Sequence, residues 1–196
     1  MCVPHVRREE VDAARWPQGN VARVTWTAPD VDRKGGSTVA GEREMLEGYL
    51  RWHRESFLAK CAGLAGEQLA TRAAAPSNLS LLGLIRHLTK VERVWFRQRV
   101  AEQDVEPLFG FGDPERRDED FDDLDPARAE QEYDALLAEM RQADRAAAGL
   151  GLDDVFEAGE DEFSLRMVYL HMIGEYAQHN GHADIVREHL DGVTGA

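Results

Sequence analysis

The most informative part of this sequence is the stretch HMIGEYAQHNGHAD, residues 171–184. Three histidines and one glutamate fall within twelve residues, and the flanking apolar residues recur at helical spacing. At about 100° per residue, His171, Glu175, His179 and His182 share roughly a quarter of the helix circumference. That sector overlaps the apolar face of the same helix. The pattern therefore predicts a helix that turns a line of ionisable side chains toward the protein interior.

Ionisable groups are costly to bury unless they are paired or bound to a metal. One ion cannot use the whole line, because eight residues span about 12 Å along a helix axis. A metal with ligand bonds of about 2 Å can join only neighbours three or four positions apart. The candidate pairs are His171 with Glu175, Glu175 with His179, and His179 with His182.

A third ligand would have to come from another part of the chain. His87 is the strongest candidate, because its apolar neighbours on a predicted helix lie within about 80° of it. His53 is the second candidate, because it lies between aromatic residues at positions i−4 and i+4. Core histidines that only form hydrogen bonds are the competing interpretation of the same pattern.

Four segments have the apolar periodicity of amphipathic helices, at about residues 42–64, 81–100, 126–148 and 165–190. Cap residues fit these limits, since Ser164 precedes the last helix and Gly192 follows it. The arrangement predicts an all-α protein, a four-helix bundle with two long connections. Cys61, near the end of the first helix, is expected in the core rather than as a nucleophile.

The segments outside these helices divide into an arm and a long loop. Residues 1–38 lack sustained periodicity and are predicted to form an N-terminal arm that is irregular or partly disordered, with the bundle domain at residues 39–196. Residues 102–125 are acidic and rich in glycine and proline, which favours a solvated connection. Phe109 and Phe111 leave open the alternative of a lid over a pocket.

Composition narrows the classes of partner. The net charge of −14 at pH 7 argues against binding to a nucleic-acid backbone. The apolar runs are too short to span a bilayer, so no membrane partner is expected. Two cysteines in 196 residues do not form a disulfide framework, and a cytoplasmic location is predicted. A small-molecule substrate is the expected partner, and a homodimer stays open.

Two segments, LSLLGLIRHLTKVERVWF and SLRMVYLHMIGEYAQHNGHADIVRE, resemble the DinB-like superfamily of YfiT-like metalloenzymes, and within it the mini-circle branch. The segment GEREMLEGYLRWHRESFLAKCAGLAGEQL is similar to the first helix of that branch. The resemblance covers about residues 42–190. It implies a four-helix bundle that holds a divalent metal through His87 and the pair Glu175 and His179. With a glutamate at the first position of that pair, the sequence resembles bundles of the mycothiol-dependent maleylpyruvate isomerase type.

The resemblance also implies a class of reaction. It favours a metal-dependent S-transferase or isomerase that uses mycothiol or a similar low-molecular-weight thiol. Zinc is the expected ion, with nickel, iron and manganese as alternatives. His171 and His182 would lie around the ligands, orienting them or passing protons, and His53 would line the same cavity. A non-catalytic metal-binding stress-response bundle and a metal-dependent hydrolase are the alternative functions, so whether the protein is an enzyme stays open at this point.

Overall fold

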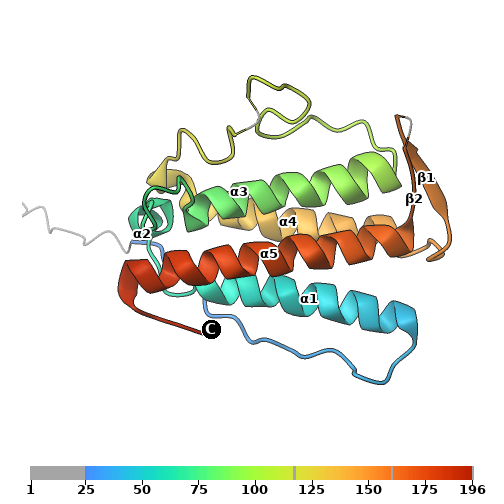
Figure 1. The fold of residues 1–196 in the computed structure, drawn as a ribbon, viewed down its shortest axis with the longest axis horizontal. Coiled ribbons are helices and arrows are strands. Elements are labelled where there is room, and N and C mark those ends of the chain that lie inside the picture. Colours follow the sequence, from blue (N-terminus) through green and yellow to red (C-terminus); the bar gives the residue numbers. More distant parts are fainter. Residues whose placement is uncertain (1–24, 117, 160, 196) are drawn as a thin grey trace, which may run out of the picture.

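The computed structural model describes residues 25–116, 118–159 and 161–195 (Figure 1). Within these ranges the chain is mostly helical, with one small two-stranded sheet, which confirms the all-α bundle. The elements in chain order are α1 (Glu42–Cys61), α2 (Gly66–Ala70), α3 (Leu81–Glu92), the π-helical segment η1 (Arg93–Val100), the 3₁₀ turn η2 (Pro126–Arg128), α4 (Ala129–Ala147), β1 (Val155–Ala158), β2 (Asp161–Ser164) and α5 (Leu165–Asp191).

The four long helices form the bundle. Helix α1 lies beside α5 and runs in the same direction, whereas α3 and α4 run the opposite way (Figure 1). Helix α3 packs against both α4 and α5. A long connection over residues 101–125 returns the chain from the end of α3 to the start of α4. In consequence, residues of α3 and α5 that are far apart in sequence face each other.

Side-chain caps begin two of these helices as the sequence indicates. The Ser80 hydroxyl accepts a hydrogen bond from the Gly83 amide at 3.1 Å, and Ser164 accepts one from Met167 at 3.3 Å. Gly192 ends α5 in the left-handed conformation, with φ of 79°. That conformation costs glycine little because it has no Cβ, so the position defines the end of the helix.

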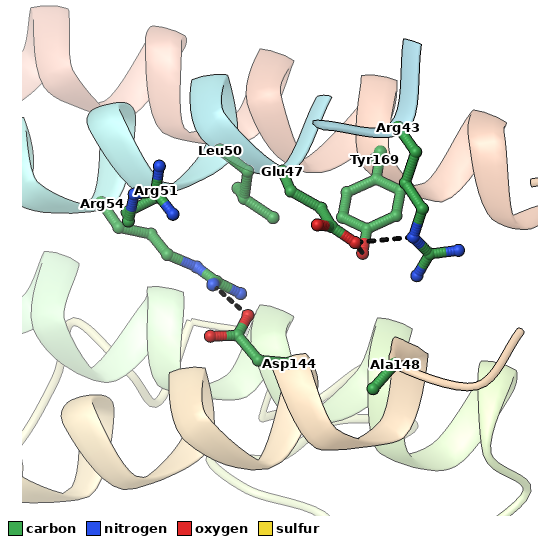
Figure 2. Close-up of a pocket in the computed structure, with 8 residues that line it drawn as sticks. All are labelled: Arg43, Glu47, Leu50, Arg51, Arg54, Asp144, Ala148 and Tyr169. Carbon is green, nitrogen blue, oxygen red and sulfur yellow. Dashed lines mark hydrogen bonds and ion pairs between the residues drawn. The ribbon is translucent and has the colours of Figure 1, made fainter. Parts of the chain in front are cut away.

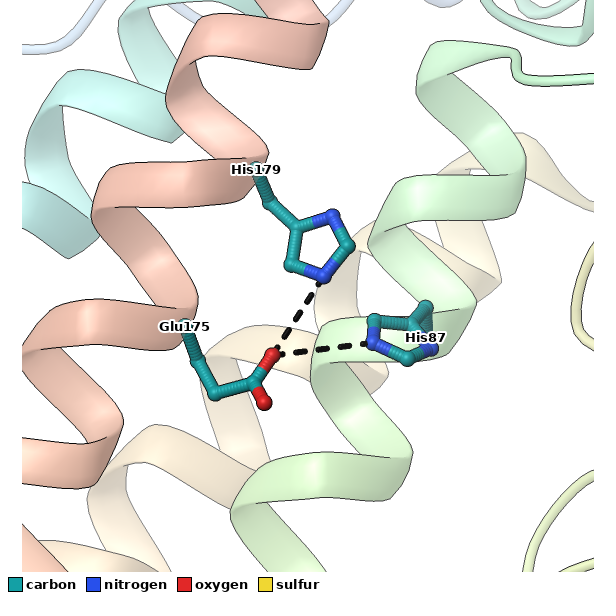
Figure 3. A group of neighbouring side chains, drawn as sticks. All are labelled: His87, Glu175 and His179. Carbon is teal, nitrogen blue, oxygen red and sulfur yellow. Dashed lines mark ion pairs between the residues drawn. The ribbon is translucent and has the colours of Figure 1, made fainter. Parts of the chain in front are cut away.

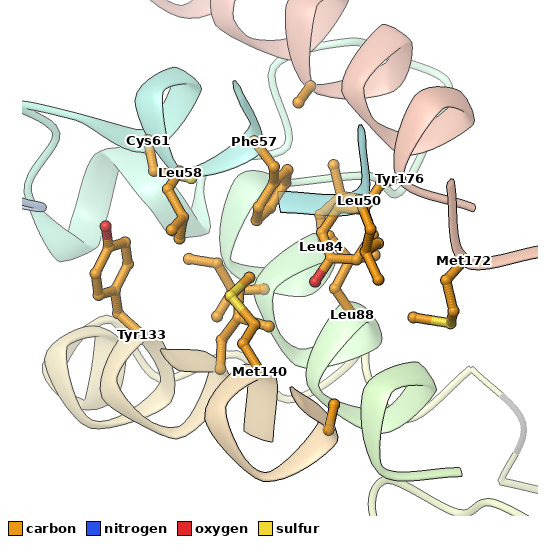
Figure 4. Packing of buried hydrophobic residues seen from close by; sticks show 14 of the residues in the cluster. Leu50, Phe57, Leu58, Cys61, Leu84, Leu88, Tyr133, Met140, Met172 and Tyr176 are labelled. Atoms are coloured by element: carbon orange, nitrogen blue, oxygen red, sulfur yellow. The ribbon is translucent and has the colours of Figure 1, made fainter. Parts of the chain in front are cut away.

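The core fills the space between the four helices (Figure 4). Leu84 and Leu88 of α3 are fully buried, as are Phe57 of α1 and Tyr176 of α5. Cys61 is also fully buried, and burial raises the pKa of its thiol to about 12. A thiol in that state is not a nucleophile at neutral pH, which agrees with the predicted core role.

Two connections differ from the expectation or extend it. The segment before α5, predicted as a plain connection, contains the antiparallel hairpin β1–β2, with Val155 opposite Ser164. Of the predicted arm, residues 1–24 lie outside the described residues. The part that follows packs on the bundle, because the amide of Ala28 donates to the Leu64 carbonyl at 2.9 Å. Within the described ranges, no helix is both long and apolar enough to cross a membrane.

Candidate metal centre

His87, Glu175 and His179 converge between α3 and α5 (Figure 3). One ligand atom from each of the three lies within 4.8 Å of the other two. The Glu175 Oε2 atom is 3.3 Å from His179 Nε2 and 4.0 Å from His87 Nε2. Of the alternatives that the sequence leaves open, the structure brings together the pair Glu175 and His179 with His87 as the third group.

The local structure explains why these side chains meet. Glu175 and His179 are four residues apart on α5, so they lie one above the other on one face of the helix. His87 reaches them from α3, which packs beside α5. The two helices are also joined in the core, where the Tyr176 hydroxyl donates to the carboxylate of Glu92 at 2.8 Å. Because Tyr176 follows Glu175 in the sequence, that bond ties α5 to α3 close to the site.

His87 has a second partner that the sequence interpretation missed. Its Nδ1 atom is 2.8 Å from Oδ2 of Asp120, which is fully buried and also pairs with Lys90. Burial opposes ionisation of Asp120, but hydrogen bonds from His87 and Lys90 hold its pKa below the usual value. The carboxylate therefore accepts the Nδ1 proton of His87, and the Nε2 lone pair faces Glu175 and His179. This arrangement is the usual support of a metal-binding histidine.

The loop that carries Asp120 is tied to α3. The Arg86 guanidinium donates to the backbone carbonyls of Glu119 at 3.0 Å and Asp122 at 3.1 Å. The Phe121 ring stacks on His87 with 5.5 Å between ring centroids. The prediction of a solvated connection is therefore wrong at Asp120, because His87, Lys90 and Arg86 draw this part of the loop onto the helix.

Glu175 is held in its ionised form. The hydrogen bond from His179 lowers the pKa of Glu175 by more than burial raises it, and the neighbouring His171 and His87 lower it further. Two imidazole nitrogens and an ionised carboxylate form a donor set that suits zinc and several other divalent ions. The residues present therefore fit the metal that the resemblance implies.

The other predicted histidines differ in their relation to this centre. His171 Nε2 is 3.5 Å from Glu175 Oε1, and the two Nδ1 atoms of His182 and His179 are 3.3 Å apart. Burial lowers the pKa of both His171 and His182. His53 lies on α1 instead, and its backbone carbonyl accepts a hydrogen bond from the side chain of Asn180. His53 is therefore not part of the converging group.

In this bundle, α3 and α5 bring two histidines and one glutamate together. That combination defines the DinB-like class that the sequence resembles. The family model of Mycothiol-S-transferase matches residues 45–192, a stretch that spans α1 to the end of α5. The chain belongs to this family, and the resemblance to the DinB-like superfamily is confirmed. A search of curated proteins and a search of solved structures give no significant match.

Proposed function

We propose that the protein is a divalent-metal-dependent S-transferase that joins mycothiol or a similar low-molecular-weight thiol to a small electrophile. Membership of the mycothiol S-transferase family supports the class of reaction. The observation that carries the metal dependence is the convergence of His87, Glu175 and His179, with His87 oriented by buried Asp120. An isomerase that uses the same thiol would need the same site.

In this proposal His87, Glu175 and His179 hold the ion. Three protein ligands leave at least one position for an outside molecule, as in catalytic rather than structural zinc sites. The chemistry that a divalent ion supplies there is positive charge, which favours the thiolate form of a neighbouring thiol. With one carboxylate among the ligands, the centre keeps a net positive charge, and zinc is the expected ion.

The surrounding residues orient the ligands and leave a route to them. Asp120 accepts the Nδ1 proton of His87, which selects the tautomer with a free Nε2. His182 is placed to do the same for His179 through their facing Nδ1 atoms. About a quarter of the Glu175 side chain is exposed, 27%, so its carboxylate can be reached by a small molecule from solvent. His171 lies beside Glu175, and its ring packs against Trp95 with 4.2 Å between ring centroids.

The test uses the full chain, mycothiol and a chlorinated bimane whose thiol adduct is fluorescent. The thiolate sulfur displaces chloride, a carbon–sulfur bond forms, and the thiol proton passes to solvent. We expect turnover by metal-loaded protein, none after chelation and none in His179→Ala. His189→Ala is the matched control, because His189 is an exposed histidine at the end of the same helix, and it should remain active.

Other outcomes of this test separate the alternatives. Stoichiometric metal with no turnover of any thiol and electrophile would favour a non-catalytic metal-binding bundle. Metal-dependent hydrolysis without thiol would favour the hydrolase. Turnover that is unaffected by chelation would contradict the metal dependence. The homodimer and the absence of a nucleic-acid partner stay predictions.

A further inference from the structure

A pocket lies between α1 and α4 (Figure 2), whereas the candidate metal centre lies between α3 and α5. Its volume is about 400 Å³, which is within the range of small-molecule sites. It shares no lining residue with the three converging side chains. Arginines, two acids and apolar side chains line it together: Arg43, Glu47, Leu50, Arg51, Arg54, Asp144, Ala148 and Tyr169.

Arginines, rather than packed apolar side chains, bridge α1 and α4 at this pocket. At one end, Arg43 donates to the carbonyl of Ala147, the last residue of α4, at 2.9 Å, and to the carbonyl of Leu150 in the segment that follows. At the other end, Arg54 donates to Asp144 at 2.7 Å. Because both bridges are long side chains, the helices stay apart between them and the pocket remains.

Arg54 is the fixed cation of the pocket. It is 5% exposed, and two of its nitrogens each donate to the carboxylate of Glu92 at 2.6 Å. Glu92 is fully buried behind Arg54 and does not line the pocket. The third nitrogen of Arg54, Nη1, donates to Asp144, so Arg54 is held in a constant position with all three nitrogens engaged by carboxylates.

Arg51, one helical turn before Arg54, supplies a charge without a counter-charge. No hydrogen bond or ion pair joins Arg51 to any residue that the structure describes. The two carboxylates that line the pocket are already engaged, since Glu47 pairs with Arg43 and Asp144 pairs with Arg54. Glu47 therefore compensates Arg43, and Glu92 and Asp144 compensate Arg54, so Arg51 is the lining arginine that lacks a carboxylate partner.

The rest of the lining is apolar or neutral. Leu50 is 1% exposed and Tyr169 is 4% exposed, and both form the inner wall. Burial and the nearby Glu47 raise the pKa of Tyr169 to about 12, so its hydroxyl stays neutral and donates to Glu47. Ala148 adds a small side chain from α4. This wall suits a flat hydrocarbon body better than a strongly hydrated one.

We propose that this pocket binds a small organic carboxylate with a flat apolar body. The carboxylate pairs with Arg51, which is exposed, and the body lies against Leu50 and Tyr169. The site is separate from the candidate metal centre and does not depend on the transferase function. The natural ligand is defined here by its chemistry, one negative charge on a compact aromatic or aliphatic frame.

The test is an NMR titration of the full chain with benzoate, and with benzamide as the uncharged analogue. We expect benzoate to shift the amide signals of α1 and α4 around Arg51 and Asp144, and benzamide to bind at least about tenfold more weakly. Arg51→Gln should weaken benzoate by about the same factor. Asp144→Asn should tighten it, because a competing carboxylate is removed. Arg141→Gln, an exposed arginine of α4 outside the pocket, is the matched control and should change nothing.

Carboxylates also bind metals, so the titration is repeated on chelated protein. Binding that survives chelation and depends on Arg51 supports the proposal. Binding that is lost on chelation but kept in Arg51→Gln would place benzoate on the metal and overturn it. Equal binding of benzoate and benzamide, or no binding of either at millimolar concentration, would also overturn it. None of these outcomes depends on whether the protein transfers thiols.

Discussion

Asp120→Asn is expected to weaken metal binding although Asp120 is not a ligand. The substitution keeps the size of the side chain but removes the charge that accepts the Nδ1 proton of His87 at 2.8 Å. Loss of such a supporting carboxylate typically costs about 10–100-fold in metal affinity, or roughly 1.4–2.8 kcal/mol. The same change leaves the nearly buried Lys90 without its carboxylate partner, which costs about 1–3 kcal/mol of stability.

The assay must therefore separate affinity from folding. Metal affinity is measured on folded protein by competition with a chromogenic chelator, and stability by denaturant unfolding without metal. Asp122→Asn is the matched control, because Asp122 is an exposed neighbour whose ion pair with Arg72 at 3.2 Å is also exposed. It should keep wild-type affinity. If Asp120→Asn binds metal as tightly as the wild type while His87→Ala does not bind, the orienting role of Asp120 is refuted.

Three further predictions concern the ligands and the core beside them. Chelation should lower the melting temperature of the wild type but not of His179→Ala, because an ion bound only by the native state stabilises it; identical melting of the wild type with and without chelator would contradict this. Glu175→Ala should lose metal and Glu175→His should keep it with a changed ion preference, and unchanged stoichiometry in Glu175→Ala would exclude Glu175 as a ligand. Tyr176→Phe should cost about 1–3 kcal/mol in denaturant unfolding, because fully buried Glu92 loses a donor. Tyr169→Phe should cost less, and equal costs would show that burial of the acceptor does not matter.

The site residues that could be predicted from the sequence are those whose positions follow from periodicity within one helix. Glu175 and His179 share a face of α5 because they are four residues apart, and that relation needs no knowledge of the tertiary structure. His87 faces inward by the same reasoning on α3. The choice of His87 over His53 as the third group depended on the family resemblance as well, since both histidines lie on helices that flank α5.

Contacts between segments distant in sequence account for what was missed. Asp120 lies in an acidic loop whose composition indicates solvent, and only the pull of His87 and Lys90 brings it into the interior. The buried pair of Arg54 and Glu92 joins α1 to α3 over 38 positions, which no local pattern reports. Tyr49, the aromatic residue four positions before His53, is 53% exposed, because periodicity defines a face more loosely at its borders.

The proposed function depends on one divalent ion held by His87, Glu175 and His179. Anomalous diffraction from crystals of metal-loaded protein is the most direct test of that ion's position. Data collected on both sides of the absorption edge of the bound metal locate the ion independently of any functional assay. We expect one anomalous peak between α3 and α5, with two imidazole nitrogens and one carboxylate oxygen at about 2.0–2.2 Å. A peak elsewhere in the molecule, or no peak in protein that has been loaded with zinc, would contradict it.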